Sequence, residues 1–413
     1  MKTDKLEIQD VCIFVGGSQP PKEVFSDLPQ DGYVRLIQIR DYKTDRFITY
    51  IPQELARRFC DQKDIMIGRY GPPIFQICRG LKGAYNVALM KAVPKENILH
   101  EYLYYFLKQD SLFQYIDSLS LRTSGQTGVD IECLKKYPIY LPTLHIQQKI
   151  ADILSTLDAK IELNNRINAE LENLAKTIYD YWFVQFDFPD RNGKPYKSSG
   201  GEMVCNKECD RAIPAGWKVR DLGDFGIFKN GVNYDPSQPG DTLAKIVNVR
   251  NISGSSIFIH SQELDSIYLT LKEVNNYLVT NQSILIARSG IPGSTRLITD
   301  YIENTIYCGF IICFEVNNEN LKLPLFFFLK NIEKTISSQS GGTIMKNINQ
   351  SILKSFKLPL PKDPLSSDLV QNFKNKIEPI LQKINLIDKE NQQLTQLRDW
   401  LLPMLMNGQI SIK

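Results

Sequence analysis

One long stretch without glycine or proline constrains this chain more than any other feature. It runs from about residue 145 to 182 and is spelled HIQQKIADILSTLDAKIELNNRINAELENLAKTIYDYW. Its apolar residues are spaced three and four apart, which is the spacing of a heptad seam on an α-helix. The seam consists of Ile146, Ile150, Ile153, Leu157, Ile167, Leu171, Leu174 and Ile178. Such a helix would be roughly 55 Å long, so its seam needs extensive cover.

The cover could come from one large domain around a core helix or from a second, paired helix. Lys160 and Asn164 interrupt the seam, and polar seam residues favour the pair because they set the register between two helices. A partner is predicted in the same chain, between residues 369 and 406. Its seam consists of Val370, Phe373, Ile377, Ile380, Ile384, Ile387, Asn391, Leu394, Leu397 and Leu401. Pro379 should kink this second helix or mark its restart.

The two helices belong to an internal repeat. Lys160 to Leu163 matches Lys383 to Leu386, an offset of 383 − 160 = 223. Five further features recur in the same order in the segments that precede each helix. Their aligned residues are Arg40 and Arg250, Arg69 and Arg288, Leu103 and Leu325, Ser124 and Ser340, and Ile139 and Leu358, with offsets of 210 to 222. A fixed order at nearly fixed spacing indicates a duplicated unit.

The predicted fold class is therefore α/β (α+β). We expect two similar globular domains and two long coiled-coil helices, related by a pseudo-two-fold internal repeat. Each domain should combine short strands with one aromatic-rich helix. The polar stretch after the first helix is expected to be a loop. The predicted boundaries are 1–143 for the first domain, 144–186 for the central helix, 187–215 for a linker, 216–361 for the second domain and 362–413 for the C-terminal helix.

Composition and short motifs exclude several functions. The formal net charge is only +3, so a nucleic-acid surface must be a local patch. The eight cysteines form no CxxC pair and histidines number three, which argues against zinc sites and disulfide frameworks. No apolar run is long enough to span a bilayer, so we expect a cytoplasmic chain without a membrane partner. The sequence has no Walker loop, no dinucleotide-binding loop and no HExxH motif.

Several motifs together resemble the specificity subunit of type I restriction-modification systems, over essentially the whole chain. They are the Gly-Gly-x-x-Pro loop near residue 16, the Leu-Pro pairs at 141–142 and 360–361, FDFPDRNGKPYKSSGGEMV followed by IPAGWKV (213–219), LRDWLLP (397–403) and NGQI (407–410). The resemblance implies two target-recognition domains held apart by two antiparallel helices. It also implies a non-catalytic chain that binds double-stranded DNA together with two methyltransferase (modification) subunits and with restriction/translocase subunits. No cofactor is expected in this chain, whereas S-adenosylmethionine, ATP and magnesium would serve the partner subunits.

A DNA-reading domain needs cations for phosphates and planar polar groups for base edges. Residues 31–91 carry eleven Lys and Arg against six Asp and Glu, which is +5 in a chain of +3. Arg69-Tyr70-Gly71 and Arg288-Ser289-Gly290 are expected at equivalent strand ends that open onto loops. The predicted DNA-binding residues are Arg40, Arg69, Tyr70, Arg79, Lys82, Arg250, Arg288, Ser289, Arg296 and Lys346. The alternative is that these charges only solvate a loop face.

Large apolar residues crowd the end of each long helix. Those predicted to bind partner subunits are Tyr181, Trp182, Phe183, Trp400, Leu401 and Leu405; the alternative is that they pack on the globular domains. We therefore predict a sequence-specific DNA-binding specificity subunit. Each domain would read one half of a bipartite site, and the helices would set the spacer and dock the methyltransferases. The alternative function is a coiled-coil protein-interaction scaffold without DNA specificity, and a self-contained nuclease or methyltransferase is disfavoured by the missing motifs.

Overall fold

The computed structural model describes residues 6–71, 73–120, 128–235, 240–254, 256–299, 303–340, 348–365 and 367–410. The chain divides into two compact units. Unit 1 consists of Met1–Glu162 and Gln392–Lys413, and unit 2 of Leu163–Asn391. The two long helices, α5 (Leu144–Tyr179) and α10 (Asp368–Met406), each contribute a segment to both units.

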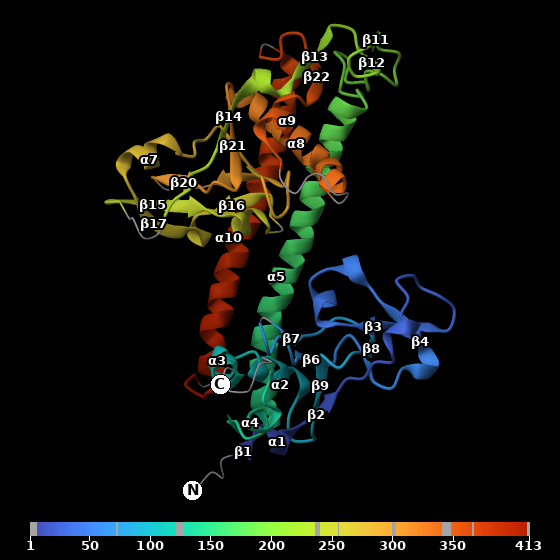
Figure 1. Ribbon diagram of the computed structural model, residues 1–413, viewed down its shortest axis with the longest axis vertical. Coiled ribbons are helices and arrows are strands. Elements are labelled where there is room, and N and C mark those ends of the chain that lie inside the picture. Colours follow the sequence, from blue (N-terminus) through green and yellow to red (C-terminus); the bar gives the residue numbers. More distant parts are fainter. Residues whose placement is uncertain are drawn as a thin grey trace. The chain divides into compact units, whose positions relative to one another are not determined.

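Unit 1 contains two four-stranded sheets. The first has the order β2 (Cys12–Gly16), β9 (Leu89–Pro94), β6 (Ile65–Gly68), β7 (Ile77–Cys78), and the second β4 (Tyr50–Pro52), β3 (Tyr33–Ile37), β8 (Gly83–Tyr85), β5 (Phe59–Cys60). Figure 1 shows α2 beside the first sheet, with β3, β4 and β8 forming a separate layer. The helices are α1 (Ile8–Val11), α2 (His100–Leu107), α3 (Asp110–Ser120) and α4 (Ile131–Lys135), and the 3-10 turns are η1 (Lys22–Val24), η2 (Ile39–Tyr42), η3 (Asp45–Phe47) and η4 (Gln53–Leu55). A short pair, β1 (Leu6–Glu7) with β10 (Pro138–Ile139), closes the unit.

Unit 2 repeats this plan with longer elements. Its main sheet has the order β14 (Gly226–Asn230), β21 (Ile311–Val316), β18 (Ser283–Ala287), β19 (Thr295–Thr299), β16 (Phe258–His260), and a smaller sheet the order β17 (Asp265–Leu269), β15 (Thr242–Val247), β20 (Thr305–Tyr307). The other helices are α6 (Val249–Ile252), α7 (Leu271–Asn276), α8 (Glu319–Ser340) and α9 (Gln350–Lys354), with η6 (Leu222–Phe225) and η7 (Ser261–Glu263). The closing pair is β13 (Trp217–Asp221) with β22 (Lys357–Pro361).

The central strand of each main sheet is buried on both faces. In β6 the side chains of Ile65 and Ile67 pack against the helices of unit 1, whereas Met66 packs against the second sheet, which contains β3 and β8. In β18, the side chains of Ile284 and Ile286 pack against the helices of unit 2. A strand covered on both sides needs an uninterrupted apolar run instead of an alternating one. This is why Ile65 to Ile67 and Ile284 to Ala287 are continuous apolar segments in the sequence.

Backbone hydrogen bonds confirm the repeat residue by residue. The amide of Gly17 donates to Leu89 O (2.9 Å), and the amide of Gly231 donates to Ile311 O (3.0 Å). The offsets are 231 − 17 = 214 and 311 − 89 = 222. The parallel pairing of β3 with β8 likewise recurs as the pairing of β15 with β20. The predicted duplication of fold is therefore confirmed.

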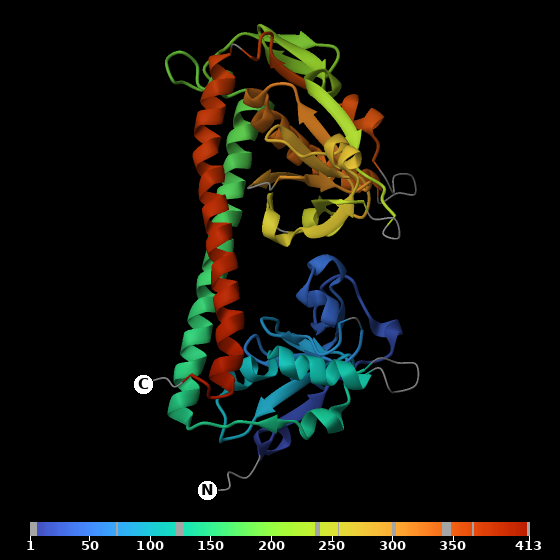
Figure 2. The same ribbon diagram turned by 90° about the vertical axis from the view of Figure 1, so that its left-hand side faces the viewer.

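The segments of α5 and α10 that share a unit run antiparallel and lie side by side (Figure 2). In unit 2, Asn164 Nδ2 donates to Glu390 Oε2 (2.8 Å) and to Asn391 Oδ1 (2.9 Å). Asn391 Nδ2 in turn donates to Asn165 Oδ1 (2.9 Å). Asn164 was predicted to set the register between the helices, and its burial at 1% exposure with these partners confirms that role.

The predicted seam of α5 is wrong at four positions. Ile153, Lys160, Ile167 and Leu174 are exposed, whereas Leu154 and Ala175 are buried. A straight α-helix has 3.6 residues per turn, so a seam counted in heptads drifts by about 20° per heptad. The globular domains also cover one flank of the helix, and this burial shifts the buried stripe by one residue. On α10, only Leu397 of the predicted seam is exposed.

Two further expectations differ from the structure. The predicted restart at Pro379 is wrong, because α10 is helical from Asp368 to Met406. Pro379 has no amide to donate to the carbonyl of Asn375 one turn earlier, and both residues are exposed on the surface of the helix. The stretch 187–215, expected to be a loop, contains the hairpin β11 (Met203–Asn206) and β12 (Arg211–Pro214). It also packs into unit 2, because the ring of Phe188 stacks on Trp217 at 5.5 Å.

In the described part of the chain, none of the helices is both long and apolar enough to traverse a bilayer.

The matched glycines give a test of the packing behind the repeat. A Cβ atom on Gly231 would lie 2.2 Å from Cys308 O, and one on Gly17 would lie 2.0 Å from Asn86 O. Gly231→Ala should therefore lower the free energy of unfolding by roughly 1–3 kcal/mol, since the backbone must shift to relieve the overlap. Gly254→Ala is the matched control, because no atom lies within 4 Å of its added Cβ. Denaturant titration of the two variants would measure the difference, and equal stability would show that the backbones are not in contact.

Candidate nucleic-acid interface

The backbone at Arg69 is fixed by loops from both sides. Its amide donates to Ala88 O (2.8 Å), and its carbonyl accepts from Val129 N (2.9 Å). The loop that contains Ala88 separates β8, which ends at Tyr85, from β9, which begins at Leu89. Asn86 turns the chain there, with its Oδ1 accepting from Ala88 N (3.1 Å), so that β8 and β9 enter different sheets. The end of the central strand is thus surrounded by loops from three parts of the sequence.

Arg288 occupies the same place in unit 2. Its amide donates to Phe310 O (2.9 Å), and its carbonyl accepts from Ile348 N (3.0 Å). The offsets are 288 − 69 = 219, 310 − 88 = 222 and 348 − 129 = 219. The predicted equivalence of Arg69 and Arg288 is therefore seen in the backbone. We call the loops around Arg69 (17–20, 69–71, 86–88 and 128–129) and around Arg288 (231–235, 288–293, 308–310 and 348) the strand-end clusters.

The side chains of the strand-end clusters differ. Arg69 lies over the ring of Tyr70, with the guanidinium carbon 5.1 Å from the ring centroid. Its Nη1 atom lies 3.5 Å from Val87 O, and its buried Nε has no partner. Tyr70 is 40% exposed. This cluster therefore presents a guanidinium and an aromatic face together, a combination that suits phosphates and bases.

In unit 2 the exposed aromatic ring comes from a different loop. Ser289 stands where unit 1 has Tyr70, and both Arg288 and Ser289 are half-buried. Phe310 is 62% exposed in the loop whose carbonyl accepts from Arg288. Sequence analysis missed Phe310 because it follows a Cys-Gly pair that gives no sign of a neighbouring arginine. The break between β20 and β21 was the available signal, since the corresponding break in unit 1 lies beside Arg69.

Arg40 and Arg250 follow equivalent strands but have different surroundings. Arg40 lies 5.4 Å above the ring of Phe47, which Arg46 also approaches at 5.5 Å. Phe47 is 50% exposed, so unit 1 displays two guanidinium groups on one accessible ring. Arg250 forms an ion pair with Asp265. Its charge is therefore partly compensated within the chain.

Arg296, Arg79 and Lys82 were also predicted to bind DNA, and each is paired with another group of the chain. Arg296 is 7% exposed and donates to Thr295 O (2.8 Å) and Gly254 O (2.7 Å). Burial lowers the pKa of Arg296 below its ordinary value. A guanidinium committed to the interior in this way has little surface left for DNA, so its placement at the interface is corrected. Lys346 lies outside the described residues.

Arg79 and Lys82 contrast with each other. Arg79 stacks on Tyr104 at 3.9 Å and forms an ion pair with Glu101 at 2.6 Å. His100, whose Nδ1 lies 3.7 Å from the carboxylate, and then the Arg79 guanidinium lower the pKa of Glu101 to about 2. Lys82 forms an exposed ion pair with Asp61 at 3.0 Å. Arg79 thus ties two elements of unit 1 together, whereas Lys82 remains on the surface.

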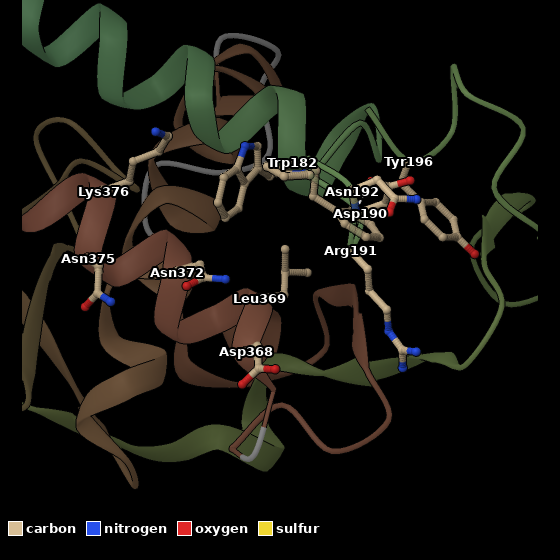
Figure 3. Close-up of a pocket in the computed structure, with 12 residues that line it drawn as sticks. Trp182, Asp190, Arg191, Asn192, Tyr196, Asp368, Leu369, Asn372, Asn375 and Lys376 are labelled. Carbon is tan, nitrogen blue, oxygen red and sulfur yellow. Dashed lines mark hydrogen bonds between the residues drawn. The ribbon is translucent and has the colours of Figure 1, made fainter. Parts of the chain in front are cut away.

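A hollow of about 940 Å³ lies elsewhere in unit 2. Figure 3 shows it between the linker, which supplies Arg191 and Tyr196, and the first turns of α10, which supply Asp368 and Asn372. The indole of Trp182 forms part of its wall. Its lining mixes both signs of charge with amides, and the described residues form no cluster of His, Cys, Asp or Glu suited to a metal ion.

A family description matches the chain twice. The model for the "Type I restriction modification DNA specificity domain" covers residues 2–173 and 214–397. The chain belongs to this family. It carries two DNA specificity domains, and each strand-end cluster lies within one of them.

Curated relatives agree with the family assignment. The chain is 28% identical over 334 residues to the MjaIX specificity subunit of Methanocaldococcus jannaschii, covering 79% of this chain and 73% of that protein. It is 25% identical over 391 residues to the HindI specificity subunit of Haemophilus influenzae, covering 79% and 81%. With the MjaVIII specificity subunit of M. jannaschii it shares 24% identity over 425 residues, covering 99% and 93%.

A solved structure agrees in fold. The S subunit of the type I restriction-modification system from M. genitalium superposes with a TM-score of 0.52 at 16% identity, covering 99% of this chain and 96% of that one. At this identity the likeness concerns the fold alone. Together with the two matched domains, it confirms the predicted class of a duplicated specificity subunit.

The residues predicted to bind partner subunits fall into two groups. Trp182 (5% exposed), Phe183 (3%) and Leu405 (2%) lie in the cores of this specificity subunit, so their placement on a partner surface is corrected. Trp182 and Phe183 pack on Phe373 with ring centroids 5.8 and 5.0 Å away. Leu401 is half-buried against the core of unit 1. The exposed members are Tyr181 (38%) and Trp400 (55%).

Sequence analysis missed a repeated set of exposed leucines on the long helices. Leu163 (44%) and Leu174 (48%) on α5 correspond at offset 223 to Leu386 (62%) and Leu397 (44%) on α10. Each pair is eleven residues apart, which is about three helical turns and returns to nearly the same face. The signal was in the sequence, because these leucines match one another in the repeat, but they were assigned to the seam or left unassigned.

The role of Arg79 can be tested by stability. Arg79→Ala should lower the free energy of unfolding by roughly 1–2 kcal/mol, since it removes a cation–π contact and an ion pair. Lys82→Ala, which removes an exposed pair, should change it by less than about 0.5 kcal/mol. The pKa of Glu101 is lowered on folding, so its stabilising effect is present above its unfolded pKa near 4.5 and is lost as pH falls towards about 2. Denaturation of both variants at several pH values measures this, and wild-type stability with an altered DNA motif in Arg79→Ala would return Arg79 to the interface.

Proposed function

We propose that this chain is the DNA-reading, non-catalytic subunit of a type I restriction-modification complex, in which each strand-end cluster reads one half of a bipartite site. The observation that carries the proposal is the duplicated strand-end cluster. Two arginines on equivalent backbone positions, each beside an exposed aromatic ring, stand at the edge of two similar sheets. The backbone is the same in both, and the exposed side chains differ, as two different half-sites require.

The chemistry of the clusters suits duplex DNA. Arginine pairs with the O6 and N7 atoms of guanine or with phosphates, and exposed rings contact thymine methyl groups or bases. The pair of guanidinium groups on Phe47 adds positive charge to unit 1 where sequence analysis found the excess of +5. A local patch of this kind binds DNA although the net charge of the chain is only +3.

The partners follow from the same proposal. Two methyltransferase subunits, using S-adenosylmethionine, would dock on the long helices, one per repeat. Restriction/translocase subunits, using ATP and magnesium, would complete the assembly. The exposed Leu174 of unit 2 and the exposed Leu397 of unit 1, related by the repeat offset of 223, support two similar docking sites, because exposed apolar residues mark interaction surfaces. The helices would also set the length of the unspecified spacer between the half-sites.

The complex should be tested by expressing the chain with its methyltransferase subunit in a host and sequencing the methylated genome. A bipartite motif with one fixed spacer is expected. A gel shift with random duplex DNA, with and without the methyltransferase, separates this function from a coiled-coil scaffold without DNA specificity. Absence of both a motif and a shift would favour the scaffold.

Arg69→Ala and Arg288→Ala form a matched pair for the two half-sites. If each arginine contacts guanine bidentately, discrimination at one position should weaken by roughly 1–3 kcal/mol, in opposite halves of the motif for the two variants. If an arginine touches only phosphate, binding should weaken for all sequences and the salt dependence should become shallower by about one unit. Methylome sequencing and salt titrations give these quantities. An unchanged motif and affinity in both variants would remove the strand-end clusters from the DNA.

Leu174→Asp and Leu397→Asp test the docking surfaces. A charge in an apolar contact should prevent binding at that site, so each variant should retain one methyltransferase and the double variant none. Light scattering of the purified complexes measures the stoichiometry. Leu271→Asp, at a residue 58% exposed on α7, is the control for a surface change and should retain both subunits. Full stoichiometry in the double variant would show that docking occurs elsewhere.

A further inference from the structure

One aspartate in each unit connects three structural parts at once. It lies on one long helix and is hydrogen-bonded both to the other long helix and to the recognition domain. In unit 2 this residue is Asp388 of α10, and in unit 1 it is Asp158 of α5. We call each residue with its partners a clamp.

The clamp of Asp388 uses both carboxylate oxygens. Asn168 of α5 donates from Nδ2 to Oδ1 at 2.6 Å. Ser256 of the recognition domain donates from Oγ to Oδ2 at 2.6 Å, and His260 Nε2 lies 3.2 Å from the same oxygen. The side chains of His260 and Asp388 are only 7% and 13% exposed. Partial burial makes these bonds stronger than they would be in water.

The partners of Asp388 lie at both ends of one strand. His260 is the last residue of β16, and Ser256 lies two residues before the strand begins. Ser256 Oγ also accepts from Phe258 N at 3.0 Å. β16 is an edge strand of the main sheet of unit 2 and pairs with β19. Asp388 therefore ties an edge of the recognition sheet directly to the helix pair.

Unit 1 achieves the same connection with different groups. Arg398 of α10 donates from Nη1 to Asp158 Oδ1 at 2.8 Å, and the Tyr105 hydroxyl donates to Asp158 Oδ2 at 2.8 Å. Tyr105 lies on α2, which packs beneath the main sheet of unit 1. Burial first, and then the hydrogen bond to Asp158, raise the pKa of Tyr105 above its ordinary value. The phenol therefore remains protonated and continues to donate.

The clamps are not copies made by the duplication. At the helix offset of 223, Asp158 corresponds to Leu381, and Asp388 corresponds to Asn165. The same connection between helix, helix and domain has thus been built twice from unrelated positions. Apolar packing already joins each domain to the helices, but apolar contact has no preferred direction. Hydrogen bonds to a carboxylate do have one, so they restrict how the domain can tilt.

We propose that Asp388 and Asp158 are positioning residues that fix the tilt of each recognition domain on the helix pair and thereby determine how strictly the complex requires its native spacer. The inference rests on the proposed function. Adding one base pair to the spacer moves a half-site by about 3.4 Å along the DNA and turns it by roughly 34°. A rigidly clamped domain cannot follow that change, whereas a domain that tilts on an apolar contact can.

The test uses the complete complex of this chain with its methyltransferase subunit. Initial methylation rates are measured on duplexes with the native spacer, with one base pair more and with one fewer. In Asp388→Asn the preference for the native spacer should fall by about tenfold, while discrimination against base changes in either half-site stays at the wild-type level. Simple destabilisation lowers all rates together and leaves the spacer ratio unchanged, so the ratio reports positioning.

Further variants keep the proposal open to refutation. Ser256→Ala removes one hydrogen bond to Asp388 together with the local bond from Phe258 N. Should Asp388→Asn fail to assemble, this milder variant should lower the preference for the native spacer by about threefold. Asp158→Asn, in unit 1, should also lower the preference for the native spacer, without any change in unit 2. Asp152→Asn is the control, because Asp152 accepts from Gln148 of its own helix at 2.7 Å, and it should keep the native ratio. Native spacer ratios in folded Asp388→Asn, Ser256→Ala and Asp158→Asn would overturn the inference. A wild-type complex without any bipartite motif would instead refute the proposed function.

Discussion

Each recognition sheet depends on burying one face against helix segments that are distant in the chain. In unit 2 the centre of this contact is Phe373 of α10, which is fully buried. Its ring centroid lies within 6.2 Å of four other rings, those of Tyr179, Trp182, Phe183 and Phe327. These rings come from α5, from the turn after it and from α8. The long helices are therefore part of each domain's core, and neither domain has a complete core without them.

The same dependence explains how far the sequence could predict the structure. Local patterns were sufficient for the buried strands and their ends, because a strand covered on both faces is written as one apolar run that stops at Arg69 or Arg288. They were also sufficient for the two long helices and for the polar contact at Asn164. They were not sufficient to predict which face of α5 is buried, since Ile153, Ile167 and Leu174 have the spacing of a seam but lie on the exposed face.

Long-range partners account for the remaining differences. Arg296 looked like a free cation because nothing near it in sequence indicates that its guanidinium would donate to Gly254 O and lie 3.7 Å from Glu333. Trp182 and Phe183 looked like an external patch because Phe373 lies some 190 residues away (373 − 183 = 190). Phe310 was missed because its proximity to Arg288 arises only when β18 and β21 pair. In each case the missing information was a tertiary contact.

In the two duplicated domains, residues that fix the backbone are matched, whereas residues exposed on the surface differ. Gly17 and Gly231 are the same residue type in the same place because a carbonyl of the neighbouring loop leaves no room for a Cβ atom. At the surface, by contrast, the residue of unit 2 that corresponds to Tyr70 is Ser289, and the one that corresponds to Ala88 is Phe310. Hydrogen bonds between main-chain atoms keep the loops in place whatever their side chains are. Such a scaffold allows the displayed residues to change without altering the fold.

The division of α10 between the units has a consequence for synthesis on the ribosome. Leu402, Leu405 and Met406 belong to the core of unit 1, whose other members precede residue 163. Some 230 residues (392 − 162 = 230) must be translated before that core receives its last helix segment. At about 5–20 residues per second this takes roughly 12–46 s. During that interval the nascent first unit has an open apolar face, which makes it a substrate for chaperones and for proteases until the end of α10 emerges.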